Sequence, residues 1–140
     1  MLRVRDIMNK DVVYVAPSAP VTEVARKMRD WGVGVAVVCE RGEFCGVITE
    51  RDVVGLVAAE RNPQREYAGS LVAPDLPMIS DSEEVVQAAQ AMINRGVRVL
   101  PVAQNQRFVG LLTLDDLARE CLALGAAVLA GTARPLIAKG

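Results

Sequence analysis

The stretches GVITERD at residues 46–52 and GLLTLDD at residues 110–116 place a glycine, two aliphatic residues, a threonine and an aspartate in the same order. The second stretch follows the first by 64 residues, the difference between 46 and 110. The same offset joins three further pairs: Val21 with Val85, Met28 with Met92, and Gly32 with Gly96. A constant offset over this length indicates two copies of one supersecondary unit.

The first copy has the periodicity of a short α+β unit. VTEVARKMRDWG at 21–32 has apolar residues at helical spacing and ends at Gly32, which predicts an amphipathic helix. VGVAVVC at 33–39 and FCGVIT at 44–49 are short and apolar, which predicts two strands joined by a turn at ERGE. The segment after Thr49 returns to helical spacing. The predicted order, including a short opening strand, is β-α-β-β-α.

The second copy repeats this order through MIS, SEEVVQAAQAMINRG, VRVLPVA, RFVGLLT and LDDLARECLALGAAVL. Between the copies, RNPQREYAG at 61–69 is polar and contains Pro and Gly, which indicates a linker. We expect a first repeat at 1–62, a linker at 63–69, a second repeat at 70–124 and a C-terminal tail at 125–140. Because a unit of ~60 residues buries little surface alone, the two α+β repeats should pack as a pseudo-twofold pair with a shared core.

The charge balance argues against nucleic-acid and membrane partners. The chain of 140 residues carries 16 basic and 17 acidic residues, interleaved along its length, so it has no strong long-range field. The late apolar stretch CLALGAAVLAG falls short of the ~20 residues that span a bilayer. These features predict a soluble, cytoplasmic protein.

The sequence lacks the usual signatures of catalysis. Three cysteines and no histidine argue against a zinc site. Cys39 and Cys45 flank the ERGE turn and could pair, but two buried thiols in a reducing compartment are the favoured interpretation. There is no Gly-x-Ser-x-Gly and no phosphate loop, and the adjacent Asp115 and Asp116 would diverge by about 100° on a helix. We therefore predict a protein that is not an enzyme and has no catalytic cofactor.

The Thr-x-x-Asp motif has two interpretations. Thr49 and Thr113 can cap the helices that follow them, with Asp52 and Asp116 completing capping boxes. The same geometry can bind a nucleotide, because free N–H groups at a helix N-terminus suit a phosphate and a nearby carboxylate can accept the hydroxyls of a ribose. The residues alone leave both interpretations open.

The paired units resemble tandem CBS domains, the modules named after cystathionine β-synthase. The resemblance rests on DIM at 6–8, GVRVLPV at 96–102 and the duplicated G-h-h-T-x-x-D, where h is an aliphatic residue, and it covers about residues 4–124. It implies a pseudo-twofold pair of repeats whose two clefts hold adenosine ligands such as AMP, ADP, ATP or S-adenosylmethionine.

The resemblance also implies roles for individual residues. Asp52 and Asp116 would take the ribose hydroxyls, with Thr49 and Thr113 near the phosphates, and each adenine would contact the opening segment of the opposite repeat. On this crossed pattern the first cleft adds Val47, Val72, Leu76, Pro77 and Arg98. The second cleft adds Leu111, Met8, Val12, Val13 and Gly34. Core packing is the expected primary role of the apolar members.

The two copies differ where charge matters. Arg51 in TERD corresponds to Asp115 in TLDD, and Arg98 corresponds to Gly34. If the crossed pattern holds, the first cleft gathers two arginines, which hold phosphate well, and the second gains a carboxylate, which repels it. We expect AMP, ADP or ATP in the first cleft, and the second to be weak, empty or occupied by a less anionic adenosine compound.

Two functions of different class fit these features. The first is a regulatory adenosine-nucleotide-binding module that acts in trans as a stand-alone energy or metabolite sensor. The second is an interaction or assembly scaffold whose clefts stay empty and whose motifs only cap helices. Both predict a homodimer, because the helices after the motifs have apolar faces with small residues that permit close packing between subunits.

Overall fold

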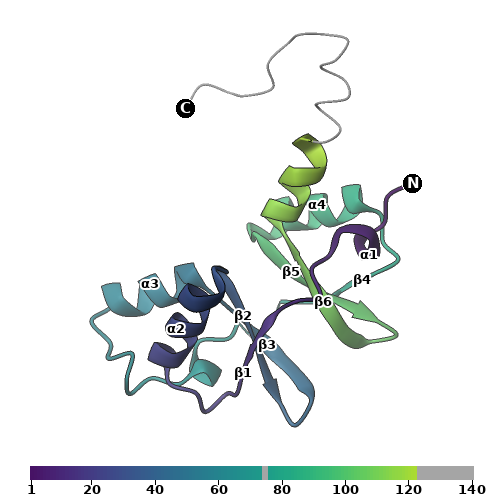
Figure 1. Ribbon diagram of the computed structural model, residues 1–140. Helices are drawn as coiled ribbons and strands as arrows, with labels where there is room; N and C mark the ends of the chain where they lie inside the picture. The colour runs from purple at the N-terminus through teal and green to yellow at the C-terminus, as the bar shows by residue number, and fades with distance from the viewer. Residues whose placement is uncertain (74–75, 123–140) are drawn as a thin grey trace, which may run out of the picture.

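The protein, described here from a computed structural model at residues 1–73 and 76–122, contains two three-stranded sheets (Figure 1). The first sheet has the order β1 (Val13–Val15), β2 (Val35–Glu40), β3 (Glu43–Thr49). The second has the order β4 (Ile79–Ser80), β5 (Val99–Gln104), β6 (Arg107–Thr113). In each sheet the first pair is parallel and the second antiparallel, so the predicted α+β duplication is confirmed.

Helices cover one face of each sheet. In the first repeat these are α2 (Val21–Trp31) and α3 (Glu50–Ala58), and in the second α4 (Val85–Arg95) and a helix whose described residues are 114–122. Gly32 and Gly96 end α2 and α4 with the same left-handed φ of 64°, which suits glycine at a helix C-terminus. The predicted helices are therefore confirmed over the described residues.

Both hairpins turn through two residues with left-handed backbone. The first turn has φ values of 52° at Arg41 and 79° at Gly42, and the second has 51° at Asn105 and 67° at Gln106. Two such residues in a row make the type I′ turn, whose twist matches that of the flanking strands. Each hairpin also has a register shift at the equivalent place, after Val38 and after Val102.

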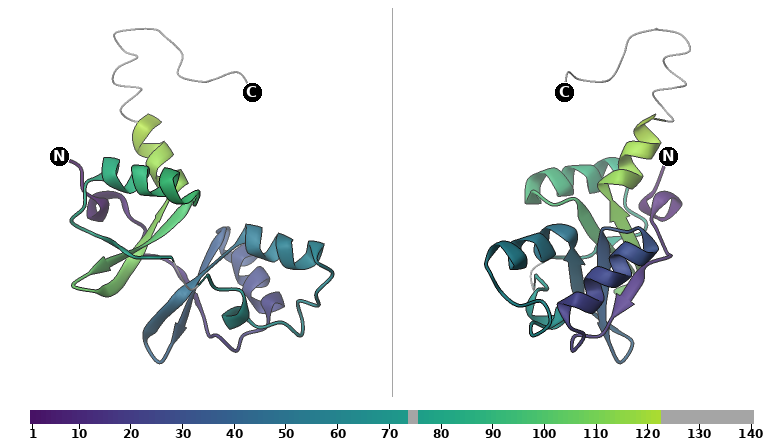
Figure 2. Two further views of the ribbon diagram at one scale, coloured as in Figure 1. Left: turned by 180° about the vertical axis from the view of Figure 1, so that it is seen from behind. Right: turned by 60° about the vertical axis from the view of Figure 1, so that its left-hand side comes forward.

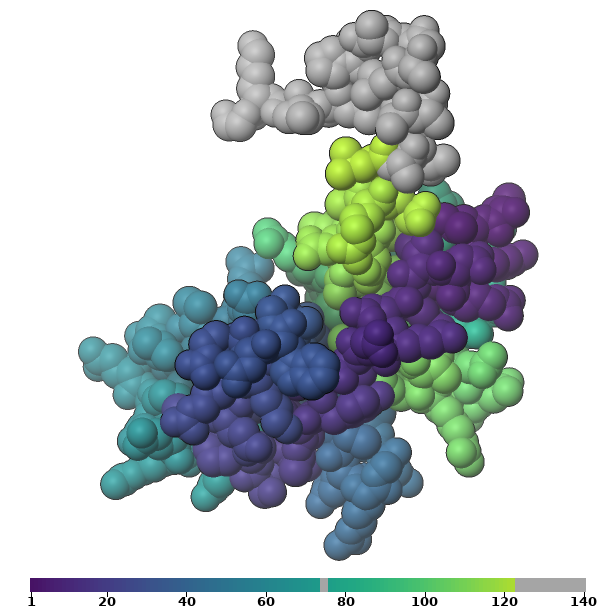
Figure 3. Space-filling model, in the orientation of Figure 1, coloured from purple at the N-terminus to yellow at the C-terminus, as the bar shows by residue number. Residues whose placement is uncertain are grey.

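The N-terminal segment packs on the second repeat, not the first. The one-turn helix α1 (Val4–Ile7), which the sequence did not predict, lies beside β4 and α4 in Figure 1. Val4 is fully buried in the core of the second repeat, and its N–H donates to the Glu83 carbonyl at 2.9 Å. The chain then crosses to β1 in the first sheet, and its side chains cover the junction of the repeats in Figure 3.

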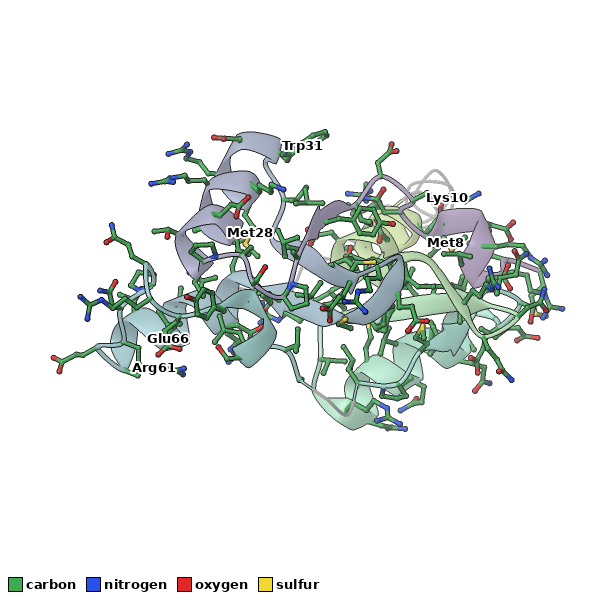
Figure 4. All side chains as sticks on the ribbon, turned by 90° about the horizontal axis from the view of Figure 1, so that it is seen from below. Met8, Lys10, Met28, Trp31, Arg61 and Glu66 are labelled. Atoms are coloured by element: carbon green, nitrogen blue, oxygen red, sulfur yellow. The ribbon has the colours of Figure 1, made fainter. Side chains whose placement is uncertain are left out.

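The segment that joins the repeats packs back on the first repeat. Ala68, at the start of the 3₁₀ helix η1 (Ala68–Ser70), is fully buried in the first core, and its N–H donates to the Ala19 carbonyl at 2.8 Å. Arg61 and Glu66 lie together in Figure 4, and their hydrogen bond lowers the pKa of the Glu66 carboxyl. The expected polar linker is thus a structural part of the first repeat.

The two repeats share a third apolar cluster at their junction. Its buried members are contributed equally by the two sheets: Val37, Val47, Val99 and Leu111. Beside it the rings of Phe44 and Phe108, equivalent residues in the two copies, stack with centroids 4.8 Å apart. The two sheets that contribute to this shared cluster lie between the helical layers of the two repeats in Figure 2. A shared core is expected for repeats too small to be stable separately.

Two further predictions concern the thiols and the membrane. Cys39 and Cys45 are free thiols, as favoured, but Cys45 is exposed and Cys39 only half-buried, so the expectation that both are buried is wrong. No helix in the described part of the chain is long and apolar enough to cross a bilayer. Most of the apolar stretch CLALGAAVLAG lies outside the described residues, as does the predicted tail.

Candidate functional site

The first motif lies at the junction of β3 and α3. Asp52 Oδ2 accepts hydrogen bonds from the Thr49 backbone N–H at 2.8 Å and from Thr49 Oγ1 at 3.0 Å, while the Asp52 N–H donates to Thr49 Oγ1 at 3.3 Å. This is the predicted capping box. Asp52 is half-buried, and its second oxygen, Oδ1, accepts no hydrogen bond from the described residues.

The second motif repeats this geometry at the end of β6. Asp116 Oδ2 accepts from the Thr113 N–H at 2.8 Å and from Thr113 Oγ1 at 2.9 Å. In contrast to Asp52, the Asp116 side chain is only 5% exposed, and its Oδ1 accepts a hydrogen bond from Nη2 of Arg119. The sequence analysis missed Arg119, although an aspartate and an arginine three residues apart on a helix are a recognisable pair.

The glycine of each motif admits the opening segment of the opposite repeat. A Cβ at Gly110 would lie 2.8 Å from the Asn9 carbonyl oxygen and 3.3 Å from Met8 Sδ. A Cβ at Gly46 would lie 2.9 Å from Cβ of Val72, the residue that corresponds to Met8. Neither position has room for a larger residue without a shift, so each glycine allows a crossing strand to approach the motif.

The residues expected to line the adenine pockets lie in four different environments. Val47 and Leu111 are buried in the cluster between the repeats, with Val12 and Leu76 at its edge. Val72 and Met8 pack at the edges of the cores of the opposite repeats, and Pro77 is exposed. Val13 is 6% exposed in the core of the first repeat, which agrees with its expected primary role in core packing.

The structure places the backbones of Arg98 and Gly34 beside the motif of their own repeat, whereas the sequence analysis expected them at the opposite motif. The hairpin register pairs Val99 with Thr113, and the Arg98 carbonyl accepts from the Leu114 N–H at 2.8 Å. Arg98 therefore lies beside the second motif, in its own repeat. Gly34 likewise accepts from the Glu50 N–H at 2.9 Å. Hairpin pairing is local and holds both residues next to the motif of their own copy.

This correction changes the charges around the two motifs. Beside the first motif, the Glu50 side chain occupies the space where a Cβ of residue 34 would lie, and the exposed Arg51 follows it. Beside the second stand Arg98 and, in place of Arg51, the exposed Asp115. Arg51 thus adjoins the first motif and the backbone of Arg98 adjoins the second.

Two surface hollows lie near these elements. One, of about 380 Å³, opens between the end of α2 and the start of α3, and its lining includes Met28, Val33, Glu50 and Val53. The other, of about 480 Å³, lies between α1 and the second sheet and is lined in part by Met8, the expected adenine-pocket residue. Figure 4 labels Met28 and Met8, which locate the two hollows on opposite halves of the molecule. The motif threonines and aspartates line neither hollow.

Comparison with known families assigns both halves of the chain. Residues 4–59 and residues 68–123 each match the CBS domain family. The chain belongs to the CBS-domain family. The duplication, the β-α-β-β-α order and the capped Thr-x-x-Asp junctions are those of a CBS pair, so the resemblance noted in the sequence is confirmed.

Curated relatives of this CBS pair have similar length or are longer. Hypoxic response protein 1 of Mycobacterium tuberculosis is 32% identical over 123 residues, which cover 86% of this chain and 85% of the relative. The uncharacterized protein MK0525 of Methanopyrus kandleri is 32% identical over 117 residues, covering 81% of this chain. The match spans only 60% of MK0525.

Solved structures show the same fold. The CBS domain pair of protein MJ0100, in complex with 5′-methylthioadenosine and S-adenosyl-L-methionine, has a TM-score of 0.80 at 19% identity, covering 89% of this chain and 98% of that one. Hypoxic Response Protein I with two coordinated zinc ions has a TM-score of 0.72 at 30% identity, covering 84% and 98%. In the described part of the present chain, no group of three or more His, Cys, Asp or Glu side chains could hold a metal.

Proposed function

We propose that this CBS pair is a regulatory module that binds an adenosine-containing ligand through Asp52 and Thr49. The observation that carries the proposal is the open oxygen of Asp52: Oδ2 is held by the helix cap, while Oδ1 accepts no hydrogen bond from the described residues. The cap thus fixes the carboxylate and leaves one acceptor for a ribose hydroxyl. The complex of the MJ0100 CBS pair with two adenosine compounds supports this ligand class.

The surroundings of Asp52 favour a ligand of low charge. The N–H groups at the start of α3 and the Arg51 side chain can attract one phosphate. The Glu50 carboxylate, which lies against Gly34, opposes further negative charge. We therefore expect AMP or S-adenosylmethionine to bind more tightly than ATP, whereas the sequence alone predicted AMP, ADP or ATP with no preference among them.

Titration calorimetry with AMP, ADP, ATP and S-adenosylmethionine tests the proposal. Asp52→Ala should abolish the tightest binding event, because it removes the ribose acceptor, and Asp116→Ala serves as the matched control because it removes the equivalent cap. A larger loss of affinity in Asp116→Ala would contradict the assignment to the first cleft. The chain should act in trans, in the cytoplasm, by binding its partner with different affinities in the free and liganded arrangements of the repeats.

A scaffold without ligands is the second candidate. It is favoured by the two capping boxes, each of which already satisfies its threonine and one aspartate oxygen without a ligand. Thermal unfolding separates the two candidates. A ligand present at 100 times its Kd adds ~2.7 kcal/mol to the stability of the protein, which a melting curve detects. No shift at millimolar concentration of any of the four ligands would favour the scaffold.

We expect the protein to form a homodimer through α3. Val54 and Val57 on this helix are 66% and 59% exposed, so the helix presents apolar surface that a second copy of the chain can cover. Light scattering on the purified chain measures the state directly. Val57→Glu should yield a monomer, and Val86→Glu, at an equally exposed apolar site on α4, should remain a dimer. An unchanged dimer in Val57→Glu would place the contact elsewhere.

A further inference from the structure

The two motif aspartates differ in whether their second oxygen is already occupied. Arg119 Nη2 donates to Asp116 Oδ1 at 2.5 Å, and the Thr113 N–H and hydroxyl both donate to Asp116 Oδ2. Each oxygen of this buried carboxylate thus has a donor from the chain itself. The Arg119 side chain is 70% exposed, so the donor to this buried carboxylate is itself in contact with solvent.

The first repeat has no counterpart of this arginine. Subtracting the 64-residue offset from Arg119 leads to Gly55, three residues after Asp52 on α3. A Cβ at Gly55 would meet no atom within 4 Å, so this position on α3 has room for a side chain. Asp52 and Asp116 are held by the same cap, but only Asp116 accepts a further hydrogen bond, from Arg119, among the described residues.

We propose that Arg119 acts as a built-in competitor for the ribose at the second cleft. A ribose hydroxyl can reach Asp116 Oδ1 only after the guanidinium has left it, whereas the first cleft, with Gly55, presents its acceptor directly. This inference rests on the proposed function. It makes residues 55 and 119 the determinants of unequal affinity, in place of the arginine pattern expected from the sequence.

The competition should be moderate and reversible. A hydrogen bond from a guanidinium to a carboxylate is stronger than one between neutral groups, and the burial of Asp116 limits its screening by water. The exposed arginine can, however, rotate into solvent, where it is well hydrated. We therefore expect a change in affinity of about tenfold, which corresponds to ~1.4 kcal/mol.

Substitutions at residues 119 and 55 test the inference, with AMP as the probe in titration calorimetry. In an Asp52→Asn background, which reports on the second cleft, Arg119→Ala should tighten AMP binding by about tenfold, and Arg119→Lys should not. In an Asp116→Asn background, Gly55→Arg should weaken AMP binding at the first cleft by about tenfold. Gly55→Ala is the control for helix propensity and should leave this affinity unchanged.

The outcomes separate this inference from the proposed function. If the wild-type chain binds AMP through Asp52 but Arg119→Ala leaves the second cleft unchanged or weakens it, the competitor role is wrong, and weakening would make Arg119 a phosphate ligand. Failure of Gly55→Arg to weaken the first cleft would likewise overturn the inference. This second arm is measured in the Asp116→Asn background, so it does not depend on the stability of the Asp52→Asn protein. Gly55→Arg itself should not weaken α3, since arginine favours a helix more than glycine does. If no variant binds AMP or S-adenosylmethionine, the proposed function itself fails, and the inference fails with it.

Discussion

The junction of β3 with α3 and the junction of β6 with the helix at 114–122 have nearly the same geometry but different neighbouring side chains. In both, a threonine and an aspartate form a capping box. The distance from the threonine N to the aspartate Oδ2 is 2.8 Å in each, and the distance from the threonine Oγ1 to Oδ2 is 3.0 Å in the first and 2.9 Å in the second. The residues around the two capping boxes differ. At the 64-residue offset, Gly55 corresponds to Arg119, Gly34 to Arg98, and Glu50 to Leu114. The pair shows that a duplicated fold can be kept while the side chains that meet a ligand change independently.

The largest losses of stability should come from substitutions at equivalent buried core positions, and they should be similar in the two repeats. Ile48 and Leu112 are equivalent and fully buried, so Ile48→Ala and Leu112→Ala should each destabilise the protein by about 2–5 kcal/mol through lost burial and a residual cavity. Urea unfolding measures both. Because the repeats share the cluster around Val47 and Leu111, each variant should show one transition. Separate transitions for the two halves would contradict this cooperative unit.

Intermediate losses of stability should come from substitutions where the opening segment of one repeat crosses the motif glycine of the other, at Gly110 and Gly46. Gly110→Ala places a methyl group 2.8 Å from the Asn9 carbonyl oxygen, and Gly46→Ala places one 2.9 Å from Val72 Cβ at a residue with φ 148°. Overpacking of this kind should destabilise each variant by about 1–3 kcal/mol. Gly55→Ala is the control, since its methyl group meets open space and favours the helix. Unchanged stability in both motif variants would show that the crossing segments are loosely held.

The smallest effects should come from the caps. Thr49→Ala and Thr113→Ala each remove a hydroxyl that accepts the aspartate N–H, and each should lower the free energy of unfolding by about 1 kcal/mol. Thr49→Ser and Thr113→Ser retain the hydroxyl and should remain close to wild type in the same urea titrations. Thr113→Ala should lower the free energy of unfolding less than Thr49→Ala does, because Arg119 continues to hold Asp116 after the threonine hydroxyl is lost.

The features that depend on neighbours along the chain could be predicted from the amino-acid sequence. The 64-residue offset, the β-α-β-β-α order and the two capping boxes all arise from local spacing, because helix and strand periodicity and the three-residue reach of a cap are properties of short segments. The Asp116–Arg119 pair belongs to the same class. It was predictable from a spacing of three residues on a helix and was overlooked.

The contacts between segments of different repeats could not be predicted from the sequence and are known from the folded structure. The packing of α1 on the second sheet, of Ala68 in the first core, and of Met8 and Val72 against the motif glycines joins residues that are far apart in sequence. The placement of Arg98 beside Leu114 and the open oxygen of Asp52 follow from strand register and from what surrounds each motif. Such contacts depend on how two amphipathic halves bury their remaining apolar surface against each other, which no pattern within either half specifies.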